Sequence, residues 1–219
     1  MLSSLTLKGS VLMPLNGKLS DSVVLMFHGY GSSGDDLIGI GRAWQKFLPK
    51  TVFLAPNGID PWEGGGLGHQ WFSIKNHNTK NFKFTAMSKI IPIIKKYINE
   101  ILCVYEILPS RLVLMGFSQG SMLALRVGLE KDINLAGIIV YSGAFIREEN
   151  FRPNIHVPVA LFHGKKDESI PYSMFLETQK KLESLNVSVT SKIYPLLGHG
   201  ISEESIKDGL LFLNQILNV

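Results

Sequence analysis

The sequence contains a single cysteine, Cys103, among 219 residues. One thiol cannot close a disulfide within the chain or supply a cysteine-rich metal site, so both are excluded. This shortage of cysteine is typical of a protein from a reducing compartment. Cys103 lies in an apolar stretch of helical character, residues 101–105, where we predict a buried, inert thiol rather than a nucleophile.

Long hydrophobic runs are also missing. No stretch approaches the roughly 20 apolar residues that span a bilayer. Residues 1–9 lack the basic start and the apolar core of a signal peptide. We therefore expect no transmembrane segment and a location in the cytoplasm.

Charge of one sign is not concentrated anywhere in the chain. The net charge is +4, from 22 Lys and Arg against 18 Asp and Glu, and basic residues occur in isolated pairs such as Lys95-Lys96. Isolated pairs are typical of a solvated surface, and no basic run carries the interleaved aromatic residues of a nucleic-acid groove. We therefore expect no nucleic-acid partner.

Short apolar segments alternate with helical segments along the chain. The segments predicted as strands are residues 23–28, 51–55, 111–116, 136–142, 157–164 and 189–194. Several are apolar at consecutive positions, which indicates strands of a mostly parallel sheet that is covered on both faces. Apolar residues at three- and four-residue spacing predict helices over residues 85–105, 118–130, 172–186 and 203–217. The pattern predicts an α/β fold.

Three features are less regular. Pro92 should kink the first of these helices or mark its true start. Residues 5–17 are predicted to form a strand or hairpin at the sheet edge. Residues 57–81 contain a glycine-rich stretch, and a long loop of this kind is more often functional than merely mobile. No linker or repeat divides the chain, so we expect one domain over residues 1–219.

Residues 116–120 have the sequence Gly-Phe-Ser-Gln-Gly and match the G-x-S-x-G pattern. They follow an apolar strand and open a helical segment, which is the context of a nucleophile elbow. At such an elbow the serine occupies a strained turn, and small residues two positions away let neighbouring backbone approach. Ser118 is therefore the candidate nucleophile.

A serine nucleophile needs a histidine base and a carboxylate, here expected in the chain order Ser, Asp or Glu, His. His199 lies in a loop after the last predicted strand and is the preferred base, whereas His156 and His163 are expected to be structural. Asp167 directly follows a strand, where an open α/β sheet builds its site. Glu168 is the nearest other candidate for this carboxylate. The alternative for Asp167 is a structural role as a helix cap.

Acyl transfer also requires N–H donors aimed at the developing oxyanion. The N–H of Gln119 follows the nucleophile, and the N–H of Tyr30 lies in the glycine-rich turn after the strand at residues 23–28. Residues 29–34 also fit a lone G-x-G-x-x-G pattern. A phosphate-binding loop is disfavoured, because neither a Walker lysine nor the acidic residue of a dinucleotide site follows.

Four motifs together resemble the phospholipase/carboxylesterase family of α/β hydrolases, which includes acyl-protein thioesterases. They are FHGYG (27–31), GFSQGS (116–121), FHGKKD (162–167) and GHG (198–200). The resemblance implies a metal-independent serine esterase without cofactor, with Ser118, Asp167 and His199 as its triad and the Tyr30 and Gln119 amides as its oxyanion hole. It also implies an acyl groove that draws on Trp62, Leu67 and Trp71.

The expected protein is a serine carboxylesterase with an α/β-hydrolase fold and no separate cap domain. Its substrate would be a small acyl ester or thioester, with lysophospholipids and S-acylated proteins as further candidates. A peptidase or haloperoxidase on the same scaffold is one alternative, because fold does not decide substrate. A non-catalytic binding protein is another. Phe82, Phe84 and Phe151 are compatible with the face of a homodimer and equally with the core.

Overall fold

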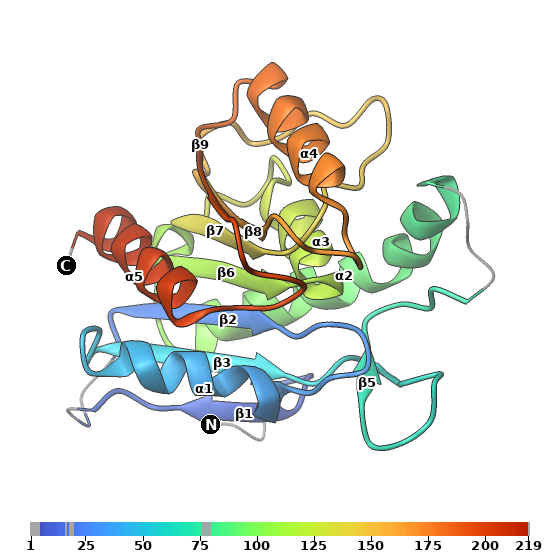
Figure 1. The fold of residues 1–219 in the computed structure, drawn as a ribbon. Helices are drawn as coiled ribbons and strands as arrows, with labels where there is room; N and C mark the ends of the chain where they lie inside the picture. The colour runs from blue at the N-terminus through green and yellow to red at the C-terminus, as the bar shows by residue number, and fades with distance from the viewer. Residues whose placement is uncertain (1–4, 16, 18–19, 76–79, 219) are drawn as a thin grey trace.

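A seven-stranded sheet forms the centre of the computed structural model, which describes residues 5–15, 17, 20–75 and 80–218 (Figure 1). The strands lie in the order β1-β3-β2-β6-β7-β8-β9, and only the β1–β3 pair is antiparallel. Their bounds are β1 Gly9–Leu12, β2 Ser22–Phe27, β3 Thr51–Pro56, β6 Leu112–Phe117, β7 Gly137–Tyr141, β8 Val159–Gly164 and β9 Val189–Tyr194. All six predicted strands are present. The predicted edge strand is β1, but it forms no hairpin with β2 because β3 lies between them.

Strand β2 shows why the central strands are apolar at consecutive positions. Its side chains alternate between the two faces, so that Val23, Leu25 and Phe27 pack in one core cluster. Val24 and Met26 pack in a second cluster on the opposite face. Both faces are therefore removed from water, as expected for parallel strands between helices.

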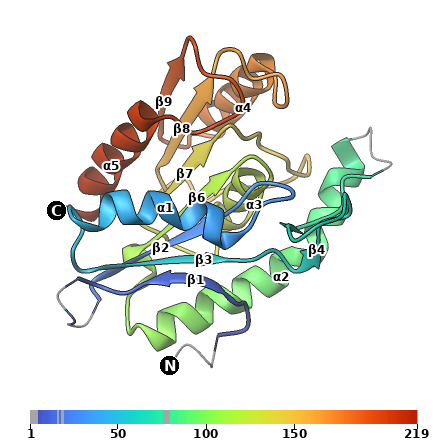
Figure 2. The same ribbon diagram turned by 60° about the horizontal axis from the view of Figure 1, so that its bottom comes forward.

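Helices cover both faces of the sheet, as predicted (Figure 2). One face carries α1 (Gly34–Gln45) and α5 (Glu203–Leu217). The other face carries α2 (Lys80–Val104), α3 (Gln119–Gly128) and α4 (Tyr172–Ser184). Within the described residues, the only strands outside the main sheet are the two-residue β4 (Asp60–Pro61) and β5 (His69–Gln70), and no separate cap domain covers it.

Helix α1 is missing from the sequence-based expectation, which treated its first residues as part of a glycine-rich turn. A local signal was nevertheless present. Ser33 is the N-cap, and its hydroxyl accepts a hydrogen bond from the Asp36 N–H while the Asp36 carboxylate accepts one from the Ser33 N–H. This reciprocal capping box satisfies two N–H groups that a helix start otherwise leaves unpaired.

Helix α2 differs from its prediction in two respects. It begins at Lys80, so Pro92 lies inside the helix and does not mark its start. Cys103 lies on its exposed side, so the prediction of a buried thiol is wrong; helical spacing turns this position away from the core that its neighbour Ile101 enters. Among the described residues, no helix is long and apolar enough to cross a membrane.

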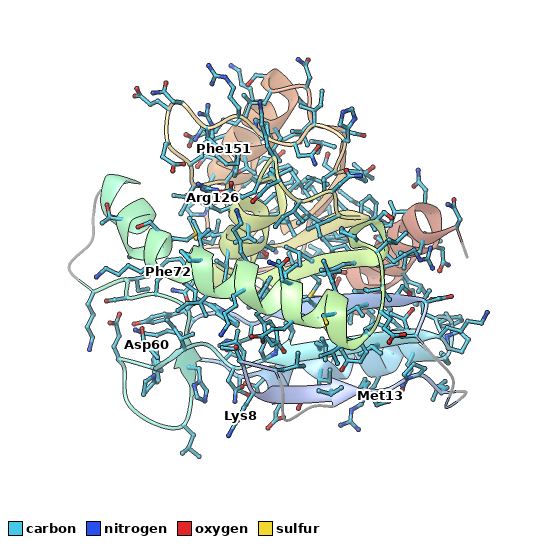
Figure 3. All side chains as sticks on the ribbon, turned by 180° about the vertical axis from the view of Figure 1, so that it is seen from behind. Lys8, Met13, Asp60, Phe72, Arg126 and Phe151 are labelled. Atoms are coloured by element: carbon cyan, nitrogen blue, oxygen red, sulfur yellow. The ribbon has the colours of Figure 1, made fainter. Side chains whose placement is uncertain are left out.

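Phe151 belongs to the core rather than to an exposed face. Its ring centroid lies 5.9 Å from that of Phe145 and 4.4 Å from the Arg126 guanidinium carbon (Figure 3). The side chains of Phe82 and Phe84 lie outside the described part of the structure. A homodimer therefore stays a prediction.

We expect Leu25→Ala to lower the free energy of unfolding by about 2–5 kcal/mol, because Leu25 is 0% exposed in β2 and its truncation leaves a cavity. Leu211→Ala is the matched control, since Leu211 is 66% exposed on α5, and its effect should stay within about 0.5 kcal/mol. Urea denaturation measures both changes. Equal effects of the two substitutions would contradict the described core.

Candidate active site

Ser118 lies on the tight turn between β6 and α3. Its φ of 53° and ψ of −114° place a non-glycine residue in a strained region of backbone space. Gly116 and Gly120, on either side of Ser118, are required because other backbone atoms lie too close to leave room for a side chain. A Cβ on Gly120 would lie 2.0 Å from the Phe27 carbonyl oxygen, and one on Gly116 would lie 2.4 Å from the backbone of Gly120. The turn therefore has the sharp strand-to-helix geometry of a nucleophile elbow.

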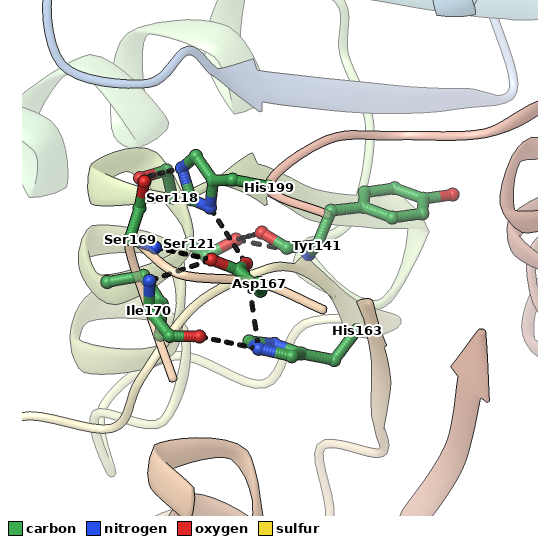
Figure 4. A network of polar contacts seen from close by, with 8 residues as sticks. All are labelled: Ser118, Ser121, Tyr141, His163, Asp167, Ser169, Ile170 and His199. Carbon is green, nitrogen blue, oxygen red and sulfur yellow. Dashed lines mark hydrogen bonds and ion pairs between the residues drawn. The ribbon is translucent and has the colours of Figure 1, made fainter. Parts of the chain in front are cut away.

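Three side chains from distant parts of the chain meet at this turn (Figure 4). The Ser118 Oγ lies 3.0 Å from Nε2 of His199, and Nδ1 of His199 lies 2.8 Å from Oδ2 of Asp167. Asp167 follows β8 and His199 follows β9. Because the carboxyl ends of parallel strands share one edge of the sheet, the topology brings these loops to the serine.

Asp167 is buried and held by backbone donors. Its Oδ1 accepts hydrogen bonds from the N–H groups of Ser169 at 3.0 Å and Ile170 at 2.8 Å. Burial alone would raise the pKa of this carboxyl, but the hydrogen bonds from His199 and Ile170 outweigh it and lower the pKa. An ionised Asp167 can only accept, so the His199 Nδ1 carries the proton and Nε2 is free to accept from Ser118.

His163 holds the loop after β8 that carries Asp167. It is buried, and its Nε2–H donates to the Ile170 carbonyl oxygen at 2.8 Å, while the same nitrogen lies 3.6 Å from Asp167 Oδ2. Burial lowers the pKa of His163, so its imidazole is neutral near pH 7. His156 is exposed at the surface.

The turn after β2 lies against the nucleophile. A Cβ on Gly29 would be only 3.5 Å from the Ser118 Cβ. The two amides after Tyr30 are used internally, since the Gly31 N–H donates to the His69 carbonyl oxygen and the Ser32 N–H donates to the Gly29 carbonyl oxygen. Among the residues that the structure describes, no hydrogen-bond partner is found for the N–H groups of Tyr30 and Gln119. These two donors are available to a ligand.

His28, which the sequence did not single out, holds the turn after β2 by a hydrogen bond to its backbone. The Gly58 N–H donates to its Nε2 at 2.9 Å, so Nδ1 carries the proton and donates to the Gly29 carbonyl oxygen at 2.7 Å. The side chain is fully buried, and burial lowers its pKa. A neutral His28 therefore joins the Gly29–Tyr30 turn to the segment after β3.

The segment carrying β4 and β5 is fastened to the elbow by the side chain of Gln119. Its Oε1 accepts from the Trp71 N–H at 2.9 Å, and its Nε2 donates to the Phe72 carbonyl oxygen at 2.7 Å. Trp71 is itself buried, with its indole N–H donating to the His28 carbonyl oxygen. The residue after the nucleophile thus positions this segment as well as exposing its own amide.

A cavity of about 370 Å³ opens in front of Ser118. It is lined by Tyr30, Phe72, Ile74, Ser118, Gln119, Met122, Ser169, Ile170 and His199. Its apolar walls were not singled out in the sequence, although simple spacing could have found two of them. Met122 lies one helical turn beyond Ser118 on α3, and Ile170 lies three residues after Asp167.

The three predicted groove residues are not among the residues that line this cavity. Trp62 packs its ring at 86° against that of Tyr30, with 6.1 Å between the ring centroids. Leu67 follows the three glycines at residues 64–66 and is 98% exposed. Trp71 faces inward and lines a separate cavity beside α2. A role of these three in substrate binding stays a prediction.

No group of three or more His, Cys, Asp or Glu side chains that could hold a metal ion occurs in residues 5–15, 17, 20–75 and 80–218.

Solved structures define the class of this fold. The crystal structure of esterase PE8 matches with a TM-score of 0.90 and 30% sequence identity, over 96% of this chain and 99% of that chain. The Bacillus cereus carboxylesterase shares the fold, with a TM-score of 0.80 at 17% identity over 98% and 96% of the two chains. The protein is an α/β hydrolase.

Sequence similarity identifies the family. Residues 16–217 match the phospholipase/carboxylesterase family, and the chain belongs to it. Similar proteins include acyl-protein thioesterase 1 of Gibberella zeae, 26% identical over 90% of this chain and 91% of the relative. Another is esterase YpfH of Escherichia coli, 25% identical over 88% and 82% of the two chains. The resemblance inferred from four motifs is confirmed, and the protein is a serine hydrolase. Its membership of this family supports ester or thioester hydrolysis as its reaction.

We expect the free energy of unfolding to fall as the pH is lowered from about 7 to about 5. The pKa values of His28 and His163 lie below the usual 6.5, so the unfolded state binds more protons than the native state in this range. Each imidazole contributes a loss of up to about 1.4 kcal/mol per pH unit. Urea denaturation at several pH values measures the slope.

Two variants identify the groups that cause this slope. His28→Gln should reduce it, because an amide oxygen can accept from Gly58 without titrating. His156→Gln is the exposed control and should keep the slope of the parent protein. An unchanged slope in His28→Gln would contradict the neutral, buried state of His28.

Proposed function

We propose that this protein hydrolyses carboxylic ester or thioester bonds of acyl substrates through Ser118, His199 and Asp167. The observation that carries the proposal is the continuous chain of contacts from Ser118 Oγ through the His199 imidazole to the Asp167 carboxylate. The strained elbow and the two unpaired amides beside it supply the other parts that acyl transfer requires.

In the first half of the reaction, Ser118 Oγ attacks the acyl carbonyl carbon while His199 Nε2 takes the hydroxyl proton. The negative charge moves to the carbonyl oxygen, where the N–H groups of Tyr30 and Gln119 would stabilise it. Collapse of the tetrahedral intermediate breaks the bond to the alcohol or thiol, which leaves with the proton from His199. Ionised Asp167 stabilises the imidazolium throughout.

In the second half, water attacks the acyl-enzyme carbonyl as His199 takes a proton from it. A second tetrahedral intermediate collapses to the carboxylic acid, and Ser118 recovers its proton from His199. Each step uses only side chains and amides of this chain together with water.

The cavity in front of Ser118 supports an acyl substrate. Phe72, Ile74, Met122 and Ile170 give it apolar walls, while the polar groups converge at the serine. The name acyl-protein thioesterase and the family description phospholipase/carboxylesterase suggest two further substrate classes, acyl proteins and phospholipids. Within these classes we propose S-acylated proteins and lysophospholipids. The single cysteine favours a reducing compartment, and we propose the cytoplasm as the location of the reaction.

Ser118→Ala should abolish the burst of p-nitrophenol release from a p-nitrophenyl acyl ester and should abolish labelling by a fluorophosphonate. Both require an activated hydroxyl at this position. Ser173→Ala, on the exposed side of α4, is the matched control and should retain both signals. Burst kinetics in Ser118→Ala would overturn the assignment of the nucleophile, and failure of the parent protein to react with the fluorophosphonate would favour a non-catalytic binding protein.

Asp167→Asn should lower kcat by about 10⁴-fold, because a neutral amide no longer holds the His199 Nδ1–H tautomer or stabilises the imidazolium. The exposed Asp132, which pairs with Lys95, gives the control Asp132→Asn. Steady-state hydrolysis of the same ester measures kcat. A loss no larger than that of the control would exclude Asp167 from the triad.

A further inference from the structure

Glu63, between β4 and β5, accepts several hydrogen bonds from residues of two different segments. Its Oε1 accepts from the Tyr30 hydroxyl at 2.7 Å and from the N–H groups of Ile74 and Lys75, each at 3.0 Å. Its Oε2 accepts from the Ser73 hydroxyl at 2.6 Å. One carboxylate therefore collects donors from the turn after β2 and from the segment after β5.

Two of these donors belong to residues that line the cavity in front of Ser118. Tyr30 and Ile74 both line the cavity that contains Ser118, and they are 44 positions apart in the chain. Within the described residues, the structure gives no direct hydrogen bond between Tyr30 and Ile74. Glu63 joins these two lining residues through Oε1.

The protonation states of Glu63 and Tyr30 strengthen the hydrogen bond between them. Burial would raise the pKa of Glu63, but the hydrogen bonds from Ser73 and Tyr30 outweigh it and lower the pKa to about 2. Burial and the bond to Glu63 raise the pKa of Tyr30 to about 12. The carboxylate is thus ionised and the phenol protonated near neutral pH, which gives a charge-assisted hydrogen bond.

We propose that Glu63 is a positioning residue that holds Tyr30 and Ile74 in place beside one another in the lining of the acyl cavity. The inference rests on the proposed function, in which the Tyr30 N–H stabilises the oxyanion. Glu63 touches neither Ser118 nor the reacting atoms in this proposal. It acts by holding the Tyr30 side chain, and hence the backbone of that residue, together with the Ile74 backbone.

Packing adds a second constraint on Tyr30. The Trp62 ring lies edge-on to the Tyr30 ring, and Trp62 directly precedes Glu63. Both restraints on the Tyr30 side chain therefore come from the same short segment. A shift of that segment moves the amide relative to the oxyanion, and displacements of about 1 Å cost up to about a hundredfold in rate.

The experiment compares Glu63→Ala, Glu63→Gln and Tyr30→Phe, together with the double variant Glu63→Ala/Tyr30→Phe. Asp60→Ala is the matched control, because Asp60 is an exposed carboxylate on β4 of the same segment (Figure 3). We would measure kcat and KM on p-nitrophenyl butyrate and divide kcat by the number of fluorophosphonate-reactive sites. Partial unfolding lowers the number of sites, whereas misplacement lowers the rate per site.

We expect Glu63→Ala to lower kcat/KM per reactive site by about tenfold or more, with kcat reduced and KM raised. Tyr30→Phe should reduce kcat with little change in KM, because it removes only the bond from the oxyanion turn. The double variant should match Glu63→Ala, since both changes remove one shared interaction. Glu63→Gln should stay within about threefold of the parent protein, because its amide oxygen can still accept from Tyr30 and Ile74.

Wild-type constants per site in Glu63→Ala, or a loss equal to that of Asp60→Ala, would overturn the positioning role. So would losses from Glu63→Ala and Tyr30→Phe that multiply in the double variant. If Ser118→Ala is inactive in the same assay, these results count against Glu63 alone. Hydrolysis by Ser118→Ala would instead overturn the proposed function.

Discussion

The close approach of the elbow to β2 is the constraint on which the rest of the site depends. The backbone at Gly120 lies against the carbonyl oxygens of Phe27 and His28, a distance that excludes any side chain there. This contact holds the start of α3 beside the turn after β2. It thereby brings the Ser118 hydroxyl, the Gln119 amide and the Tyr30 amide to one place. The sharp turn requires a strained backbone at Ser118, which has a positive φ.

The second organising feature is the ionisation of Asp167. A buried carboxylate is costly unless hydrogen bonds compensate for the lost water, and here the backbone of Ser169 and Ile170 and the His199 imidazole do so. Because the charged form is favoured, the tautomer of His199 follows from hydrogen-bond chemistry alone. His163 is neutral and donates a hydrogen bond to the Ile170 carbonyl oxygen of the same loop, so Asp167 remains the charged group there.

Polar side chains, rather than regular secondary structure, hold the remaining loops at this edge of the sheet. Gln119 fastens Trp71 and Phe72, His28 fastens Gly58, and Glu63 collects the donors of Tyr30 and residues 73–75. The backbone partners of Gln119 and His28 would otherwise be unpaired away from water. Loops fixed in this way can keep a reacting geometry while the sheet supplies the stability.

The sequence by itself determined the strands, most of the helices and the identities of the three side chains that meet at the elbow. These depend on local patterns: apolar runs of strand length, the G-x-S-x-G turn, and the order of Ser118, Asp167 and His199 after successive strands. The capping box of α1 was equally local but was hidden within a glycine-rich segment. Only the tertiary structure decided that Trp71 faces inward and that Ile74 and Tyr30 share Glu63. Those features depend on which residues, far apart in the chain, come to lie close together, and no periodicity within a segment contains that information.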